Sequence, residues 1–234
     1  MEKINFKQLL KCGERIVIPM IQRNYAQGRK GVENIREPFI NAIHTALMKG
    51  RDLNLDFIYG ACETGEKFTP LDGQQRLTTL WLLHWLAAAR ERIGEEANIL
   101  KNFTYETRFS TRRFCEFMTD GTFAPTFKRK LSDEIKDSPE FFLGWEDDHS
   151  VAGMLTMLDA LNKKFYGAER MDGLWGKLNH ITFFRESIET LGATDDIYIK
   201  MNSRGKPLTK FESIKVELDR LASDGVFSMK MDTD

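Results

Sequence analysis

The sequence predicts an α+β fold that is predominantly helical and contains a small β-hairpin core. Two runs rich in aromatic and apolar residues flank the turn sequence ETGE at 63–66, a pattern typical of a β-hairpin. An apolar stretch from Leu77 to about Arg92 predicts a helix that is apolar nearly all round, as central helices are. A third stretch, 149–167, predicts an amphipathic helix from the spacing of Val151, Met154, Leu155, Leu158, Leu161 and Phe165.

Before the hairpin, the chain predicts a short helix, a strand at Arg15–Ile18 and a second helix. Pro19 should end the regular pairing of the strand, because proline has no N–H to donate to a ladder. The second helix is expected over 38–50, with Pro38 in its first turn and Gly50 at its stop. Its predicted buried face consists of Phe39, Ile40, Ile43, Ala46 and Leu47.

After the central helix, the pattern is mixed until about Trp145. The stretch 107–121 predicts a helix, 127–142 indicates a partly helical and exposed segment, and 180–189 alternates like a strand. The sequence contains no internal repeat, and no obvious linker separates these stretches.

A last helix is expected at 207–223, where Thr209 and Glu212 form a capping box. Its predicted buried face consists of Phe211, Ile214, Leu218 and Leu221. We divide the chain into a core at 1–100 and a mainly helical remainder at 101–234 that packs on it. Together they are expected to form one continuous domain.

Composition and charge argue against several classes of protein. The 34 basic and 35 acidic residues give a net charge of −1, which argues against a generally basic coat for nucleic acid. No stretch reaches the length of a membrane span, and the N-terminal residues lack the layout of a signal peptide. Cys12, Cys62 and Cys115 stand far apart, which fits a reducing cytoplasm, and we expect all three to be buried. The sequence thus predicts a cytoplasmic protein with no membrane partner.

The segment Asp72-Gly73-Gln74-Gln75-Arg76 joins the predicted hairpin to the start of the central helix. The first turn of a helix offers unpaired N–H groups and a partial positive charge, so phosphates settle there. Gly73 allows close backbone approach, Arg76 could grip phosphate oxygens, and Asp72 could hold a hydrated Mg²⁺. Gln74 and Gln75 could donate to phosphate or position a water. Chemistry alone leaves a second interpretation open, in which Asp72 caps the helix and Arg76 lies on the surface.

Two other polar loops carry arginine close to a regular element. The first follows the strand and Pro19, and the second precedes the capped helix at 207–223. A single loop of this kind is more often solvated than functional, but three in one chain suggest convergence on a polyanion. The polar and glycine residues concerned are Gln22, Arg23 and Tyr25 in the first loop, and Asn202, Arg204, Gly205 and Lys206 in the second.

The motifs IPMIQRNYAQG, LDGQQRLTTL and IYIKMNSRGKPLTKFE, in this order, resemble the N-terminal domain of GmrSD-type restriction endonucleases. The most specific mark is DGQQR followed at once by Leu77, Thr78 and Thr79. It is similar to the shorter DG-x-x-R signature of ParB-like and sulfiredoxin-like nucleotide-binding folds. The resemblance extends from about Phe6 to Leu221, although 100–175 adds little to it.

The resemblance implies a small ParB-like mixed α/β core with many added helices. It also implies binding and hydrolysis of nucleoside triphosphates and defence against phage DNA, often modified DNA. Mg²⁺ as cofactor is our own inference from the carboxylate of Asp72. Carried over by position, Asp72, Gly73, Gln74, Gln75 and Arg76 would form the nucleotide site. Within it, we infer that Asp72, Gln74, Gln75 and Arg76 act in catalysis, with Asp72 also as the metal ligand. The residues expected to bind nucleotide or phosphate are Gln22, Arg23, Tyr25, Gly73, Arg76, Thr78, Asn202, Arg204, Gly205 and Lys206.

The sequence also departs from the pattern of the family. Ala26, Gln27 and Gly28 follow Tyr25, where relatives often carry an aromatic residue, so a stacking role is in doubt there. Many relatives continue into a nuclease domain with a His-Asn-His metal site, and no clustered histidines indicate one here. We therefore expect that this chain does not cut DNA itself and that a separate nuclease subunit or domain is its partner. It could be the regulatory half of a two-protein system, one domain of a longer protein, or a gene fragment.

DNA is a further candidate partner. The basic runs at 110–114 and 127–130 could contact its phosphates, although such runs are usually solvated and acidic residues lie nearby. Trp81, Trp85, Phe183 and Phe184 could stack on a base, although their spacing favours core packing.

Three hypotheses follow. The first is a Mg²⁺-dependent nucleoside triphosphatase that senses or licenses an antiphage nuclease. The second is a module that binds nucleotide or DNA without turnover. The third is a structural role, in which DGQQR only braces the hairpin against the central helix.

Overall fold

The computed structural model describes residues 2–19, 25–29, 31–63, 66–106, 109–168 and 170–187. All of them fall within one compact unit, 1–191. The second unit, 192–234, lies outside the described residues, and so does the helix expected at 207–223.

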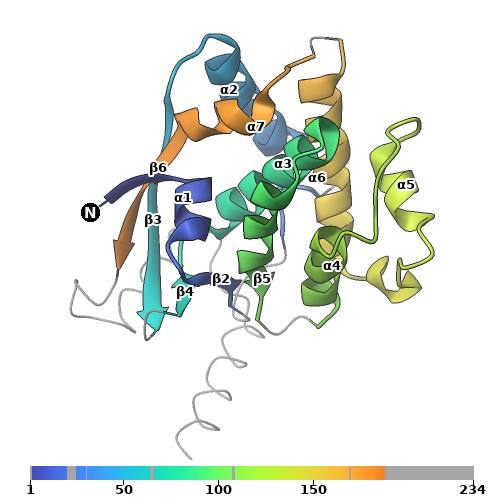
Figure 1. Ribbon diagram of the computed structural model, residues 1–234, viewed down its shortest axis with the longest axis horizontal. Helices are drawn as coiled ribbons and strands as arrows, with labels where there is room; N and C mark the ends of the chain where they lie inside the picture. Colours follow the sequence, from blue (N-terminus) through green and yellow to red (C-terminus); the bar gives the residue numbers. More distant parts are fainter. Residues whose placement is uncertain are drawn as a thin grey trace, which may run out of the picture. The chain divides into compact units, whose positions relative to one another are not determined.

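Six strands form one mixed sheet in the order β1-β6-β3-β4-β2-β5 (Figure 1). They are β1 (Glu2–Asn5), β2 (Arg15–Ile18), β3 (Leu53–Glu63), β4 (Lys67–Pro70), β5 (Phe103–Tyr105) and β6 (Ile181–Ser187). The pairs β1/β6 and β3/β4 are antiparallel, whereas β2/β4, β2/β5 and β3/β6 are parallel. The predicted α+β class is confirmed, while the closer likeness to ParB stays a prediction.

Helices surround α3, which runs through the centre of the domain (Figure 1). They are α1 (Phe6–Lys11), α2 (Glu33–Met48), α3 (Gln74–Glu91), α4 (Phe109–Thr119), α5 (Leu131–Lys136), α6 (His149–Tyr166) and α7 (Leu174–Lys177). Short 3₁₀ turns cover Glu95–Asn102, Leu143–Trp145 and Leu178–His180. Every residue from Leu77 to Ala88 is buried, because α3 contacts α1, α6 and α7. The predicted central helix is confirmed.

The hairpin is also confirmed, with Cys62 opposite Phe68 in the antiparallel pair β3/β4. The expected apolar face of α6 is buried throughout, and Trp81, Trp85 and Phe183 lie in the core. The strand at β6 and the helix at α4 lie where the sequence predicts them.

Three expectations on local structure are wrong. Helix α2 begins at Glu33, so Pro38 lies inside it and not in its first turn. The early start adds a turn that contains Arg36, which is buried and donates to Arg29 O in the preceding loop at 3.2 Å. Cys12 is exposed because it follows the end of α1, where its thiol donates to Gln8 O at 3.1 Å. Cys62 is only partly buried.

Strands β1 and β5 were not expected from the sequence. Each has at most four residues, which is too short for an alternating pattern to stand out. β5 pairs with β2, and β6 pairs with β3, so strands from both sides of residue 100 share the sheet. The division of the chain at that position stays a prediction.

His84 on α3 should make the domain less stable in mild acid. Burial lowers the pKa of His84 to about 3, and Nδ1 lies 2.7 Å from Leu80 O, which fits a neutral ring that donates to this carbonyl. The unfolded chain therefore takes up a proton near pH 6.5 while the folded chain does not. The stabilisation is complete above pH 6.5 and is lost as the pH falls toward 3, by as much as about 1.4 kcal/mol per pH unit.

Urea unfolding at pH 7.5, 6.5, 5.5 and 5.0 measures this effect, with His84→Phe as the comparison. Phenylalanine keeps the ring packing against Phe6 and Trp175 but cannot be protonated. The difference between the two proteins isolates His84 from the carboxylates. If the free energy of unfolding changes with pH equally in the parent and in His84→Phe, the unfolded-state protonation of His84 does not contribute in this pH range.

Candidate functional site

The DGQQR motif forms the start of α3, directly after strand β4. Gly73 occupies the N-cap position with a left-handed backbone (φ 84°, ψ 2°) and provides no side-chain cap. A Cβ atom at this position would lie 2.8 Å from Ile58 Cγ1, so both the backbone and the space require glycine. The first helical bond runs from Leu77 N to Gly73 O at 2.9 Å. The alternative interpretation, in which Asp72 is the cap, is therefore wrong.

Arg76 lies in the first turn of α3 and reaches back to the hairpin. Its guanidinium donates to the carbonyl oxygens of Leu55 and Phe57, the second at 2.7 Å. Between them, Asp56 has a left-handed backbone (φ 60°) at an irregularity in the pairing of β3 with β6. The Arg76 side chain is only 22% exposed, so the expectation of a surface arginine is also wrong. Its planar fork braces strand β3 against the helix.

Asp72 is the exposed residue of the motif, with 56% of its side chain accessible. Its backbone N–H donates to Tyr59 O at 3.2 Å, which fixes the position of the main chain. Its carboxylate lies 3.6 Å from an Arg76 nitrogen. An ion pair of this kind at the surface contributes little stability, so the carboxylate can turn toward another cation at small cost.

The side chains of the two glutamines of the motif hydrogen-bond to main-chain atoms of two different segments. Gln74 is buried, and its amide nitrogen donates to Pro70 O at the end of β4. Gln75 Oε1 accepts the N–H of Ala26 at 2.7 Å and that of Gln27 at 3.4 Å. Gln75 thus ties the first polar loop to the DGQQR motif.

The same loop is held one turn further along α3. The Tyr25 hydroxyl lies 2.6 Å from Thr79 Oγ1, which in turn donates to Gln27 Oε1 at 2.6 Å. Burial raises the pKa of Tyr25, so the phenol stays neutral and can donate this bond. Thr78 Oγ1 lies 2.9 Å from the Tyr105 hydroxyl and so contacts β5.

Helix α6 supports the other side of the loop. Ser150 Oγ accepts the Tyr25 N–H at 3.1 Å. Gly28 and Gly153 bring the two backbones together, since a Cβ on Gly28 would lie 1.8 Å from Gly153 O. A surface cavity of about 410 Å³ lies beside this contact, with Arg29 and His149 on its wall. The loop 25–29 is therefore fixed between α3 and α6.

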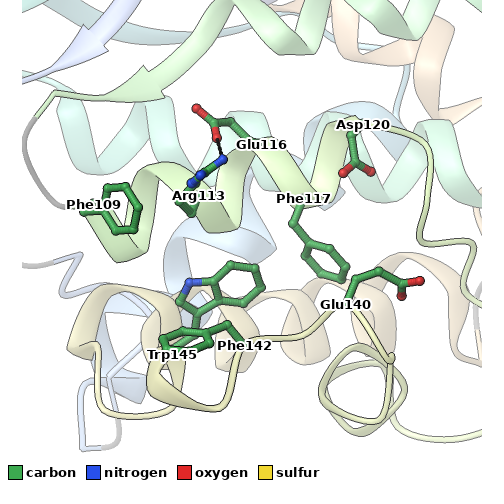
Figure 2. A pocket seen from close by; sticks show the side chains of 8 residues that line it. All are labelled: Phe109, Arg113, Glu116, Phe117, Asp120, Glu140, Phe142 and Trp145. Carbon is green, nitrogen blue, oxygen red and sulfur yellow. Dashed lines mark hydrogen bonds and ion pairs between the residues drawn. The ribbon is translucent and has the colours of Figure 1, made fainter.

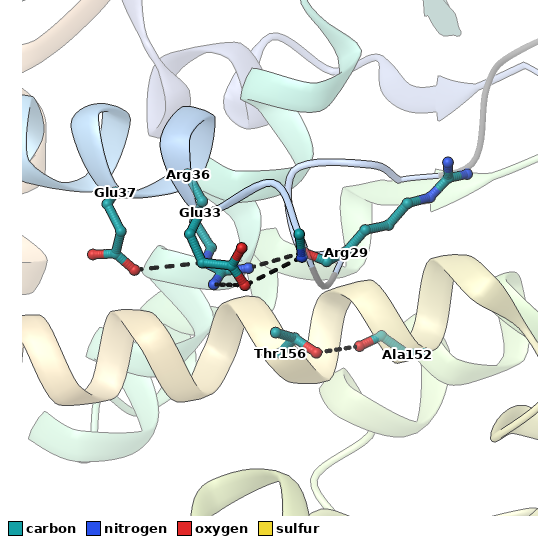
Figure 3. Close-up of polar contacts among 7 residues, drawn as sticks. Arg29, Glu33, Arg36, Glu37, Ala152 and Thr156 are labelled. Carbon is teal, nitrogen blue, oxygen red and sulfur yellow. Dashed lines mark hydrogen bonds and ion pairs between the residues drawn. The ribbon is translucent and has the colours of Figure 1, made fainter.

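Arg36 closes the far end of the loop (Figure 3). It donates to Arg29 O at 3.2 Å and to Glu33 Oε1 at 3.3 Å, and it lies 3.6 Å from Glu37. The Arg29 side chain itself points away from this cluster. Sequence analysis did not identify Arg36, Gln27 or Ser150, because nothing in a polar loop or a helix end indicates their distant partners.

Comparison with known proteins identifies the family. The sequence profile described as GmrSD restriction endonuclease, N-terminal domain, matches residues 6–218. The chain belongs to this family. Membership gives it a restriction-related function. No match was found among curated proteins.

In this GmrSD N-terminal domain, the structure brings together parts of two of the three motifs. Tyr25 and the DGQQR residues contact the same end of α3 through Gln75 and Thr79. Six predicted residues lie outside the described residues, namely Gln22, Arg23, Asn202, Arg204, Gly205 and Lys206. Their roles, and the convergence of the third motif, stay predictions.

No group of three or more histidine, cysteine, aspartate or glutamate side chains that could hold a metal ion occurs in the described part of the chain. Among the same residues, no helix is long and apolar enough to cross a membrane.

In the two basic runs proposed as DNA contacts, three basic side chains form ion pairs with nearby acidic residues. Arg113 pairs with Glu116 at 3.4 Å, Arg129 with Asp137 at 2.7 Å, and Lys130 with Asp159 at 3.2 Å. These pairs reduce the positive field that a DNA backbone would meet. DNA contact through these runs stays a prediction that this geometry does not favour.

Proposed function

We propose that this domain binds a nucleoside triphosphate at the N-terminus of α3 and hydrolyses it with Mg²⁺. In this proposal it acts in the cytoplasm as the regulatory part of a restriction system that defends against phage. The observation that carries the proposal is the start of α3, where Gly73 leaves the helix without a side-chain cap between Asp72 and Arg76.

The electrostatics at this position favour a phosphate. α3 has 18 residues, and its dipole places partial positive charge on the N–H groups of the first turn. Gly73 has no side chain to keep a ligand away from them. A phosphate at such a site accepts backbone N–H groups and meets a favourable field at the same time.

Arg76 and Asp72 have complementary roles in the proposal. The contacts of Arg76 with Leu55 and Phe57 fix the guanidinium, so its positive charge needs no rearrangement when phosphate arrives. Asp72 is accessible and only weakly paired, so its carboxylate can hold Mg²⁺ or orient the attacking water. Bound Mg²⁺ supplies neutralisation of charge on the phosphates.

Gln74 and Gln75 fit positioning roles better than direct contact with substrate. Their side chains bind Pro70, Ala26 and Gln27, so they fix the main chain on both sides of the helix start. Arg23 lies two residues before Tyr25 in the sequence, and we propose that Gln75 and Thr79 position its loop for phosphate binding.

The structural role remains a second candidate, and a specific observation favours it. The side chains of Gln74, Gln75 and Arg76 all bind main-chain atoms of the domain itself. If bracing is their whole purpose, no nucleotide should bind. Asp72 separates the two candidates, because it contributes little to bracing.

The deciding experiment compares Asp72→Asn with Asp172→Asn, each in the full chain. Asp172 is an exposed partner of Arg170 at 2.7 Å, close to the opposite end of α3, about 27 Å away for a helix of this length. Both changes should leave the free energy of unfolding within about 0.5 kcal/mol of the parent. Thermal unfolding with each nucleoside triphosphate, with and without Mg²⁺, and phosphate release are measured for all three proteins.

The parent and Asp172→Asn should gain thermal stability with at least one nucleotide, because ligand that binds only the folded state raises the midpoint. Asp72→Asn should lose phosphate release by about 100-fold or more. Absence of any midpoint shift in the parent would leave the bracing role as the function of the motif. Binding without phosphate release in the parent would support a module that does not turn over nucleotide.

A further inference from the structure

A pocket of about 340 Å³ lies between α4 and the segment 140–145 (Figure 2), and no residue of the DGQQR motif lines it. Its aromatic lining includes Phe117 and Trp145, whose ring centroids are 5.4 Å apart, and Phe142, 6.3 Å from Trp145. Phe114 and Phe141 pack edge-on against Trp145 and hold it in place. Phe117 and Trp145 are each only 5% exposed, so they form the base of the pocket, and its accessible aromatic surface comes mainly from Phe142 and Phe109.

Large apolar residues are exposed at and beside this pocket. Phe142 is 66% exposed, Leu143 is 76% exposed, and Phe109 at the start of α4 is 63% exposed. They are three of the five large hydrophobic residues that are exposed in the described part of the chain. Exposed apolar residues that gather beside a cavity mark interaction sites.

The charge of the pocket is uneven. Asp120 and Glu140 lie at one end, with the Phe117 ring between them (Figure 2). Asp120 accepts hydrogen bonds from Thr122, and Glu140 from Ser138 Oγ. Neither carboxylate has a basic partner within the described residues.

The other end of the pocket is nearly neutral. There Glu116 pairs with Arg113 at 3.4 Å, and the Arg113 guanidinium lies 5.2 Å from the Phe109 ring centroid. The acidic end therefore keeps an uncompensated negative charge beside aromatic faces. Both features attract a cation, the first by Coulomb forces and the second through the ring quadrupole.

We propose that this pocket is a docking site for a segment of a partner protein that presents lysine or arginine beside an apolar residue. The methylene stem lies along Phe142, and the cationic head reaches Asp120 and Glu140. The apolar neighbour covers Leu143. Nucleic acid does not fit, because its phosphates would meet the two carboxylates.

A random peptide display library selected on the full chain tests the specificity. Selection on the Asp120→Asn/Glu140→Gln double variant is the comparison. The control is Glu146→Gln/Asp147→Asn. It also removes two negative charges, but from exposed positions nearby that do not line the pocket. The parent and the control should enrich peptides with lysine or arginine next to an apolar residue, and the double variant should not.

One enriched peptide and its norleucine counterpart, which lacks the charge, are then titrated against each protein. The dissociation constant should rise about tenfold or more in the double variant and for the norleucine peptide, and stay within about twofold in the control. Phe142→Ala should weaken binding as well. Enrichment of peptides without a basic residue, no enrichment, or equal affinity for both peptides would overturn the proposal. A parent that sediments as a dimer, broken by the double variant, would replace it with contact between two copies.

Discussion

Replacing Gly28 with alanine should lower the free energy of unfolding by at least about 3 kcal/mol, because two backbones meet there. The new Cβ atom would lie 1.8 Å from Gly153 O and 2.4 Å from Gly153 C. Main-chain atoms cannot rotate away as a side chain can, so the loop or α6 must move. Movement of the loop would also break the bonds of Tyr25 with Ser150 and Thr79.

Urea unfolding of Gly28→Ala measures this loss, with Gly176→Ala as the matched control. A Cβ on Gly176 meets no atom within 4 Å, and Gly176 lies inside helix α7, where the backbone suits alanine. Gly153→Ala is a second variant, since its Cβ would lie 2.8 Å from Tyr25 O. A Gly28→Ala protein as stable as the Gly176→Ala control would contradict the close packing of the loop on α6.

Replacing Arg76 with alanine should cost about 2–4 kcal/mol, more than an exposed arginine would. The change removes the donors to Leu55 O and Phe57 O at the irregular point of β3, where the φ of Asp56 is positive. Those carbonyl oxygens would lose charge-assisted hydrogen bonds, and the strand would lose its brace. Lysine should not restore the stability, because one ammonium cannot reproduce the planar fork.

Arg170→Ala is the control, since Arg170 is 68% exposed and pairs only with a surface aspartate among the described residues. Urea unfolding gives the stability, and amide hydrogen exchange of β3 shows whether the loss is local. The predicted exchange is faster at 55–59 in Arg76→Ala and unchanged in Arg170→Ala. Arg76→Ala with parental stability would mean that the contacts with β3 carry no energy.

This result also affects how the functional variants are interpreted. Arg76→Ala is expected to lose nucleotide binding and stability together, so it cannot separate the nucleotide site from the brace. Asp72→Asn can, because its carboxylate has only a long contact with Arg76. Asp72→Asn is therefore the better test of the nucleotide site.

Elements that depend on local pattern could be predicted from the sequence. The turn sequence at 63–66 identified the hairpin, and the apolar run from Leu77 identified the buried central helix. The residue that begins that helix was harder to predict. Aspartate is a common cap, but Gly73 holds the N-cap position because a side chain there would collide with Ile58.

The contacts of the candidate site depend on residues far apart in the chain. Gln75 meets Ala26, Arg76 meets Phe57, and Tyr25 meets Ser150. The sequence indicated that these polar residues were unusual, but hydrogen-bond partners 19 to 125 positions away leave no local pattern. Phosphate binding and internal bracing use the same residue types, and only the structure shows the second use.

The pairing of β1 determines the order in which this domain can fold. β1 has one neighbour in the sheet, β6, and Glu2 lies opposite Arg185. During synthesis, the first strand must therefore wait without its partner until nearly all of the described chain has left the ribosome. The loop at 25–29 can meet α3 much earlier, but its support on α6 also arrives late. A ribosome-bound chain that ends before residue 181 would carry the DGQQR motif with the edge of its sheet incomplete, and it would need protection from aggregation at that edge.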